Sequence, residues 1–238
     1  MGFIYWYLRK VIIVTRPEPF NEPICAKLAA LGQDHIYLPA ASLVPVSSPK
    51  RLTTEMVMFL SPASVLYAPM LQHVKYAFAV GPKTARAVET RFGITCHYPI
   101  KGAFSVQGLC QDALFKSCMQ KMQHVSILGA EGTEQKRFES LRDGMTVSFI
   151  ATHRLQPMTK RPAMPLAEAG EIWFTSFKLM QLFCAYYIDT LKLKNLLSYD
   201  IVVPNAQCVD LAQTIGFHRS VDLIDQPTDA TFLARLKD

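Results

Sequence analysis

The sequence is poor in the features that define several large classes of protein. None of its six cysteines forms a CxxC pair and its six histidines are scattered, so we expect neither a disulfide framework nor a zinc site. No apolar run approaches the length of a membrane span. In the stretch 2–10 the apolar residues precede the basic ones, the reverse of the order in a signal peptide. We therefore expect a cytoplasmic protein without a membrane span, in which 2–10 is an extension before the first strand or, alternatively, a tail that touches a membrane weakly.

The common motifs of catalysis and nucleotide binding are also missing. No GxGxxG follows a predicted strand, and GxxxxGK[ST], HExxH and GxSxG do not occur. No nucleophile–base pair stands out, and no basic block is interleaved with aromatic residues. The sequence gives no support to a bound nucleotide, a metal, covalent catalysis or nucleic-acid binding.

A modest excess of positive charge is present. The 25 Lys and Arg residues exceed the 19 Asp and Glu residues, for a formal net charge of +6. This balance suits an acidic ligand, although such an excess is more often simply a solvated surface. The 238 residues, half of them hydrophobic, suffice for two modest domains or one large one.

Short apolar runs alternate with amphipathic stretches along the whole chain. Unbroken runs of this length are typical of strands buried on both faces of a parallel sheet. Several of the amphipathic stretches end in a glycine, a signal for the end of a helix, at Gly32, Gly93, Gly144 and Gly216. The pattern predicts an α/β fold with parallel sheets. The predicted strands are 11–14, 35–38, 57–60, 77–80, 95–98, 125–128, 147–150, 172–175, 201–203 and 220–224.

The two halves of the chain repeat the same pattern. Both 77–94 and 200–217 contain an apolar run, a turn, an amphipathic stretch and a glycine near the end. Any two β–α units share some likeness, but matching order and spacing favours an internal duplication. Weaker correspondences join 57–65 with 172–180, 32–45 with 144–157, and 14–23 with 128–137.

Two Pro-rich stretches without helical period, 38–50 and 151–170, interrupt the alternation at equivalent points of the two halves. We interpret both as linkers. A chain that crosses between domains at both of them would have a discontinuous first domain.

Small polar residues follow most of the predicted strands and precede helices. Taken singly, each is most simply a helix N-cap. Together they would lie beyond the carboxyl ends of parallel strands, where helix N-termini present free N–H groups to an anion. We therefore predict that these turns hold a ligand with many carboxylates. The turns contain Ser61, Lys83 with Thr84, Gly129, Ser176 and Asn205, and Ser105 and Thr228 open two further helices.

Several short motifs occur in a characteristic order: VIIVTRPEP, LGQDHIYLPAASLVPV, FLSPASV, FAVGPKTARAV, YPIKGAFSVQGL and FTS. Together they resemble the uroporphyrinogen-III synthase family over about residues 11–236. The resemblance implies two α/β domains joined by a two-stranded linker, the first made of 1–40 and 155–238 and the second of 45–150.

The resemblance also implies an activity. Members of this family are cytoplasmic enzymes that need no cofactor, and we expect a monomer. They close the linear tetrapyrrole hydroxymethylbilane, which has eight carboxylates, to uroporphyrinogen III with inversion of ring D. Ring A loses its hydroxyl group, ring D attacks through its substituted carbon, and the resulting spiro intermediate fragments and recloses. The protein must fold the bilane, help hydroxide to leave and prevent closure without inversion.

Few residues can be carried over from the family. Arg16 is the Arg of its TRP motif, Ser61 the Ser of its first Ser-Pro turn, Thr84 the Thr after VGxx, and Ser176 the Ser of FTS. Two positions depart from the family pattern. Gln207 stands at a Thr position, and His153 stands where a Tyr proposed as an acid is common. The predicted substrate-binding residues are therefore Arg16, Ser61, Lys83, Thr84, Gly129, Ser176, Asn205 and Gln207.

His153 is the one candidate proton donor, and the simpler alternative makes it a linker residue without a catalytic role. For the whole chain, the alternative to an enzyme is a degenerate relative that binds a tetrapyrrole or another polyanion without converting it. A two-domain solute-binding protein is disfavoured, because the expected leader is missing.

Overall fold

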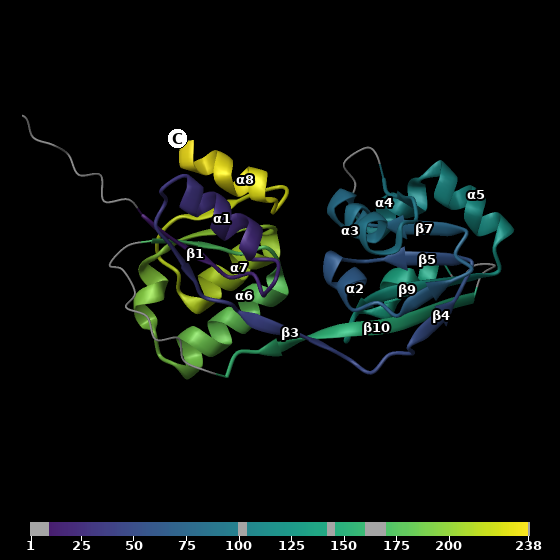
Figure 1. Ribbon diagram of the computed structural model, residues 1–238. Coiled ribbons are helices and arrows are strands. Elements are labelled where there is room, and N and C mark those ends of the chain that lie inside the picture. The colour runs from purple at the N-terminus through teal and green to yellow at the C-terminus, as the bar shows by residue number, and fades with distance from the viewer. Residues whose placement is uncertain (1–9, 100–103, 142–145, 160–169, 238) are drawn as a thin grey trace, which may run out of the picture. The chain divides into compact units, whose positions relative to one another are not determined.

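The computed structural model describes residues 10–99, 104–141, 146–159 and 170–237. The chain forms two compact units, one of 1–42 with 156–238 and the other of 43–155 (Figure 1). No helix in the described ranges is both long and apolar enough to cross a membrane. Most of the stretch 2–10 and the part of the second predicted linker from 160 to 169 lie outside those ranges.

The first unit is built on a five-stranded sheet in the order β13-β12-β11-β1-β2, in which every neighbouring pair is parallel. The N-terminal strand β1 pairs along its full length with β11. Its strands are β1 (Val11–Val14), β2 (His35–Tyr37), β11 (Gly170–Trp173), β12 (Asp200–Val203) and β13 (Val221–Leu223). Its helices are α1 (Glu22–Ala30), α6 (Phe177–Phe183), which continues as a π-helical segment (Cys184–Thr190), a 3₁₀ turn (Lys194–Ser198), α7 (Ala206–Ile215), α8 (Asp229–Ala234) and a final 3₁₀ turn (Arg235–Lys237).

The central strands of this sheet are buried, as their apolar runs predict. All four residues of β11 and of β12 are buried. Ile12 and Val14 of β1 pack with Trp173 and with Phe232 of α8 in one hydrophobic cluster. Burial on both faces explains why these strands are unbroken apolar runs rather than alternating ones.

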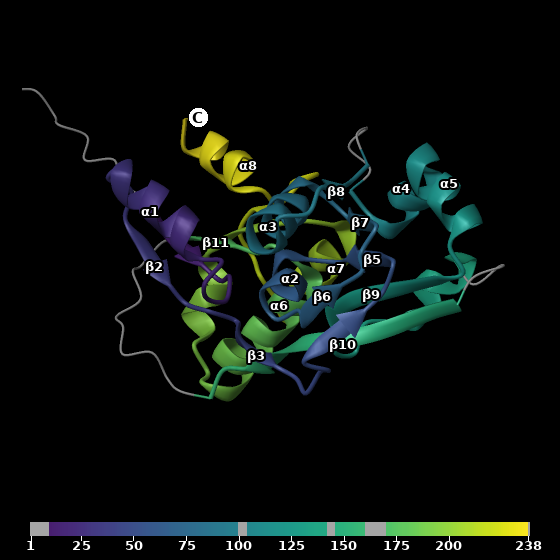
Figure 2. The ribbon, with the colours of Figure 1, turned by 45° about the vertical axis from the view of Figure 1, so that its right-hand side comes forward.

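The second unit contains a six-stranded sheet in the order β3-β10-β9-β5-β7-β8, and β10 runs beside β9 (Figure 2). Strand β9 pairs with β10 and β5, and β7 pairs with β5 and β8, in each case parallel. Its strands are β3 (Ala41–Pro45), β5 (Met56–Phe59), β7 (Tyr76–Ala79), β8 (Cys96–His97), β9 (His124–Ala130) and β10 (Thr146–Pro157), and β4 (Arg51–Thr53) pairs separately with β6 (Met70–Gln72). Its helices are α2 (Pro62–Leu66), α3 (Pro82–Phe92), α4 (Val106–Gln111), α5 (Ala113–Lys121) and a 3₁₀ helix (Gln135–Leu141).

Strand β5 shows how this sheet is covered on both faces. Met56 and Met58 belong to one hydrophobic cluster, with Phe115 of α5, whereas Val57 and Phe59 belong to another, with Val88 of α3. Successive side chains of a strand point to opposite faces. The two clusters therefore lie on opposite faces of the sheet.

The two sheets share one strand order. Numbered along the chain, the first reads 2-1-3-4-5 from β2 to β13. In the second sheet, β9 and β10 take the places of strands 1 and 2, and β5, β7 and β8 take the places of strands 3, 4 and 5. Read from β10 to β8, that sheet then also has the order 2-1-3-4-5. This is a doubly wound order, in which the direction of winding reverses between strands 1 and 3. It agrees with the predicted duplication, which stays a prediction.

All ten predicted strands are present, most of them within one or two residues of the expected bounds. Two corrections are needed, one to a predicted helix and one to the set of strands. The stretch around 138–141 was expected to be an α-helix ending at Gly144, but it is a 3₁₀ helix, and Gly144 lies outside the described residues. Both predicted linkers contain strand, since β3 lies within 38–50 and β10 extends to Pro157; the two-stranded linker that the resemblance implies stays a prediction. The sequence pattern also missed β4 and β6, which are only three residues long.

Candidate functional site

The predicted site residues lie near the carboxyl ends of strands, in two separate sets. Arg16, Ser176, Asn205 and Gln207 belong to the first unit. Ser61, Lys83, Thr84, Gly129 and His153 belong to the second. Doubly wound folds bind their ligands at the point where the direction of winding reverses. In each sheet two of the predicted site residues lie beside that point. Arg16 and Ser176 follow β1 and β11, whereas Ser61 follows β5 and Gly129 is near the end of β9.

Three of the predicted residues are helix caps whose acceptor oxygens are already used. Ser61 accepts from the backbone N–H of Ser64 at 3.1 Å, and the Ser64 hydroxyl accepts from the Ser61 N–H in return. Ser176 accepts from the Leu179 N–H at 3.3 Å, and Asn205 from the Cys208 N–H at 3.1 Å. The capping interpretation therefore accounts for these side chains, and each removes one free N–H from its helix.

Helix α3 differs, because its N-cap is Gly81. The backbone of Gly81 has φ −172° and ψ 171°, close to the values of Ser61 (−162°, 162°) and Asn205 (−163°, 165°). Glycine has no side chain to accept the N–H of the third helical residue, which is Thr84. Within the described part of the chain, neither the amide nor the hydroxyl group of Thr84 has a hydrogen-bond partner.

The charges of the first turn also favour an anion at α3. Thr84 is 4% exposed, whereas Lys83 beside it is exposed, and no acidic residue lies in this turn. Helix α1 also lacks a side-chain cap, and the Oδ1 atom of its N-cap Asn21 is buried without a partner in the described structure. In α1, however, Glu22 occupies the first turn and opposes an anion.

Gly129 is a packing position. A Cβ atom at Gly129 would lie 2.8 Å from Leu60 Cδ1 and 3.0 Å from Phe149 Cε2. The backbone carbonyl of Gly129 accepts a hydrogen bond from the Thr152 hydroxyl at 3.2 Å. The glycine is required because two neighbouring side chains fill the space that a larger residue would take.

Arg16 is committed to an ion pair inside the first unit. Its guanidinium group pairs with Asp229, the first residue of α8, and donates to the Pro227 carbonyl at 3.3 Å. It also lies 5.9 Å from the centre of the Phe232 ring, and its side chain is only 12% exposed. Arg16 thus fastens α8 to the end of β1. In the same unit, Gln207 is exposed in the first turn of α7.

His153 is a buried residue of the second unit. It is 4% exposed, and its ring stacks on Tyr67 with 6.0 Å between the ring centres. Its Nδ1 atom lies 2.9 Å from the Thr152 hydroxyl oxygen. Because that hydroxyl donates to the Gly129 carbonyl, its oxygen is free to accept, which assigns the proton of the neutral ring to Nδ1.

The burial of His153 lowers its pKa to about 4, since the charged form loses its hydration. The ring is therefore neutral at pH 7, and its proton is directed toward Thr152. A proton donor that titrates in the usual range of an imidazole does not fit this environment.

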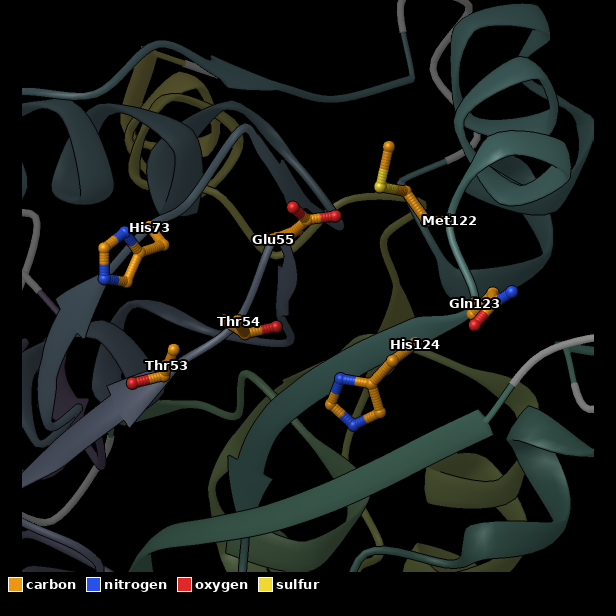
Figure 3. A pocket seen from close by; sticks show the side chains of 7 residues that line it. All are labelled: Thr53, Thr54, Glu55, His73, Met122, Gln123 and His124. Carbon is orange, nitrogen blue, oxygen red and sulfur yellow. The ribbon is translucent and has the colours of Figure 1, made fainter.

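The described part of the second unit contains a pocket of about 260 Å³, shown in Figure 3. It lies at the amino ends of β5 and β9, the opposite edge of the sheet from α2 and α3. None of the predicted site residues lines it. The lining residues are Thr53, Thr54, Glu55, His73, Met122, Gln123 and His124.

Sequence reasoning did not single out Gly81, Tyr98 or Phe104. The signal for Gly81 was readable: glycine stands where the equivalent turns have Ser or Asn. A Cβ atom at Gly81 would lie 3.4 Å from Phe104 Cβ, and the Phe104 ring contacts that of Tyr98. These contacts depend on the path of the loop after β8 and have no local signature. The described residues contain no group of three or more His, Cys, Asp and Glu side chains that could hold a metal ion.

The sequence matches no protein-family model and no curated protein. Among solved structures, the chain is similar to uroporphyrinogen III synthase from the extremely thermophilic bacterium Thermus thermophilus. A selenomethionine form of a mutant of that enzyme has 11% sequence identity and a TM-score of 0.49, over 96% of this chain and 98% of the other. The wild-type enzyme has 12% identity and a TM-score of 0.40, over 96% of each chain. At such values the likeness does not bear on activity.

Proposed function

We propose that this chain is a uroporphyrinogen-III synthase, which closes hydroxymethylbilane to uroporphyrinogen III with inversion of ring D and release of one water molecule. The order of the sequence motifs supports the assignment. The observation that carries it is the first turn of α3, where the VGPKT motif leaves the amide and hydroxyl groups of Thr84 without partners in the described structure. Two donors on one buried residue suit the carboxylate of a polyanionic substrate.

In the proposed reaction, the main task of the protein is to position the substrate. The pyrrole rings supply the electrons. The protein holds the bilane so that the substituted carbon of ring D lies next to the methylene carbon on ring A from which the hydroxyl group has left. Amide groups at a helix N-terminus suit this task, since they are held by the helix and do not titrate. We assign Thr84 to substrate binding, with Lys83 contributing positive charge nearby, and we propose no cofactor.

Release of hydroxide from ring A requires a proton, and His153 is a poor source. Its lowered pKa leaves it neutral at pH 7, and its Nδ1 proton is held by Thr152. We therefore leave His153 out of the proposed machinery and assign it to the packing of β10 against Tyr67.

A second candidate function is binding without conversion. The burial of His153 at the position of a proposed acid favours this function. The caps Ser176 and Asn205 also favour it, because their side chains occupy helix N–H groups that could otherwise bind the substrate. A degenerate relative of this kind would keep the α3 site and lose the chemistry.

A coupled assay separates the two functions. Porphobilinogen is converted to hydroxymethylbilane by purified hydroxymethylbilane synthase in the presence of this protein, and the oxidised porphyrins are then separated into isomers I and III. We expect mostly isomer III. If the ratio of isomer I to isomer III is the same with and without the protein, the non-catalytic alternative is established.

Thr84→Ala should reduce kcat/KM about tenfold, because one hydrogen bond to a charged group is lost while the helix amide remains. Thr84→Ser should restore most of the activity. Abolished turnover in Thr84→Ala with an intact fold would mean that the hydroxyl takes part in the chemistry.

A further inference from the structure

The pocket at the amino ends of β5 and β9 contains none of the residues assigned to the proposed function (Figure 3). Three connections of the second unit form it: 53–55 before β5, the turn at His73 between β6 and β7, and 122–124 at the start of β9. Its volume of about 260 Å³ lies just below the range of about 300–1,000 Å³ that is typical of drug-sized ligands. The pocket can therefore enclose a small metabolite, but not a bilane with its four pyrrole rings.

Thr54 is the most buried of the lining residues, with 4% of its surface exposed. Its hydroxyl group donates to the Met56 carbonyl at 2.8 Å and accepts from the Ser126 hydroxyl at 3.2 Å. A hydroxyl group has one proton to donate and two lone pairs. With the proton and one lone pair in use, Thr54 offers the pocket an acceptor that two hydrogen bonds hold in place.

Two imidazole rings supply donors to the same pocket. The Nε2 atom of His124 lies 2.9 Å from the Ser148 hydroxyl oxygen. Assigning that hydroxyl as the donor to Nε2 leaves the ring proton on Nδ1, where a ligand can accept it. The ring of His73 is exposed and has no hydrogen-bond partner among the described residues. His73 also has a φ of 59°, an uncommon value for a residue with a side chain and one that recurs at ligand-binding sites.

The rim of the pocket has one charge of each sign. Glu55 lines the pocket, and its carboxylate pairs with the ammonium group of Lys75 at 2.5 Å. Both side chains are more than half exposed, so the pair contributes little to stability and both groups remain open to further partners. A ligand with a single charge is attracted by one member of the pair and repelled by the other. A ligand that carries both charges can be attracted by both members.

We propose that this pocket binds a free α-amino acid, a function beyond the proposed synthase activity. The ammonium group of the ligand donates to the Glu55 carboxylate and to the Thr54 hydroxyl oxygen. The carboxylate of the ligand accepts from the imidazole of His124 and from the side-chain amide of Gln123. In Figure 3 Glu55 lies on one side of Thr54 and His124 on the other, so the two charged ends have separate partners. The half-buried thioether of Met122 provides an apolar wall for the ligand's side chain.

The site can be measured by ¹⁵N NMR titration of the full-length protein at pH 7 with L-leucine. Two analogues each lack one charged group of leucine: isopentylamine has no carboxylate, and 4-methylpentanoate has no ammonium group. We expect leucine to shift the amide resonances of Thr54, Glu55 and His124. Leucine should bind at least about tenfold more tightly than either analogue, because each analogue loses charge-assisted hydrogen bonds.

Substitutions at the two ends of the pocket should act on different ligands. Glu55→Gln should weaken leucine and isopentylamine about tenfold and leave 4-methylpentanoate no weaker. His124→Phe should weaken leucine and 4-methylpentanoate but not isopentylamine, and Gln123→Met provides a second variant if His124→Phe unfolds. Glu131→Gln is the matched control, since Glu131 is an exposed carboxylate of the same unit that pairs with Arg154 at 3.9 Å. It should change the binding of none of the three ligands.

If either analogue binds as tightly as leucine, the pocket recognises a single charge and the assignment to an amino acid is overturned. The assignment is also overturned if leucine binds the folded Glu55→Gln variant with unchanged affinity. If none of the three ligands shifts the amide resonances of Thr54, Glu55 and His124, the pocket is not a binding site for this class of molecule.

Discussion

Two buried polar residues of the second unit differ in how their hydrogen-bonding groups are satisfied. His153 belongs to a chain of contacts that runs from its Nδ1 atom through the Thr152 hydroxyl to the Gly129 carbonyl. Thr84 has no such partner in the described structure. A buried group with a partner inside the protein stabilises one local arrangement, whereas a donor without such a partner remains available to water or to a ligand. The first is typical of a structural residue and the second of a binding residue.

We expect His153 to make stability depend on pH in the acid range. Its pKa is about 4 in the folded protein and near 6.5 in an unfolded chain, so between these values the unfolded state binds one proton more. Stability is highest above pH 6.5 and falls as the pH drops toward 4, by roughly 3 kcal/mol in all. Urea unfolding between pH 4 and 7 should show this loss in the parent protein and not in His153→Phe, which keeps an aromatic ring against Tyr67.

His218→Gln, at an exposed histidine, is the matched control and should keep the pH dependence of the parent protein. If His153→Phe and the parent had the same dependence, His153 would not be a buried neutral ring.

At the scale of elements, the N-caps of the described α-helices other than α1 have extended backbones and differ in the cap residue, whereas Asn21 of α1 has a helical backbone. Ser61, Ser105, Ser176 and Asn205 all have extended backbones and accept from the third amide of their helices. Asp112 and Thr228 accept the same amide in α5 and α8. Helix α3 shares the geometry without the acceptor. Capping and anion binding compete for the same N–H group, so a helix with a side-chain cap has less to offer a ligand.

Asn205→Ala should therefore act on stability more than on substrate binding. Loss of the cap of α7 should lower the free energy of unfolding by about 1 kcal/mol. Asn205→Ser should restore most of it, since serine is an equally good N-cap. Chemical denaturation of the three proteins measures the effect, and the coupled assay shows whether KM follows. A large rise in KM with stability unchanged would instead make Asn205 a ligand-binding residue.

For the whole molecule, the common strand order of the two sheets shows that each unit combines strands from both halves of the chain. Each unit takes strands 1 and 2 from one half of the chain and strands 3 to 5 from the other, which is the arrangement expected if a duplicated unit exchanged its first two strands. Each unit has its own sheet and its own hydrophobic clusters. A packing defect should thus be felt first in the unit that contains it.

Gly170→Ala should destabilise the first unit. A Cβ atom at Gly170 would lie 2.6 Å from the backbone carbonyl oxygen of Val11, the β1 residue that pairs with it, so relief requires movement of a strand. We expect a loss of about 3 kcal/mol. The second unit contains no tryptophan, so tryptophan fluorescence follows the first unit, while far-UV circular dichroism follows both. The fluorescence midpoint in urea should fall.

Gly129→Ala is the reciprocal control. It should cost about 1–3 kcal/mol in the second unit, through contact with Leu60 and Phe149, and leave the fluorescence midpoint in place. Equal shifts of the fluorescence midpoint in both variants would mean that the two units unfold as one.

Several features of the fold could be predicted from short stretches of sequence. The run Val11–Val14 predicted a buried strand at its observed bounds, and Gly93 and Gly216 predicted helix ends, where the structure has left-handed φ values of 68° and 97°. Ser105 and Thr228 predicted N-caps that the structure contains. These features are local, because the periodicity of a strand or helix and the hydrogen bonds of a cap involve residues only a few positions apart.

The sequence by itself determined the alternation of strands and helices, the positions of the caps and the absence of a cap side chain at Gly81. Tertiary structure alone decided what each candidate residue touches: Arg16 meets Asp229, Gly129 lies between Leu60 and Phe149, and Phe104 reaches Gly81. It also decided that His153 is buried with a lowered pKa, although its position in the sequence suited a proton donor. The physical reason is that burial and pairing depend on residues far apart in the chain, and no local pattern specifies which of them the fold brings together.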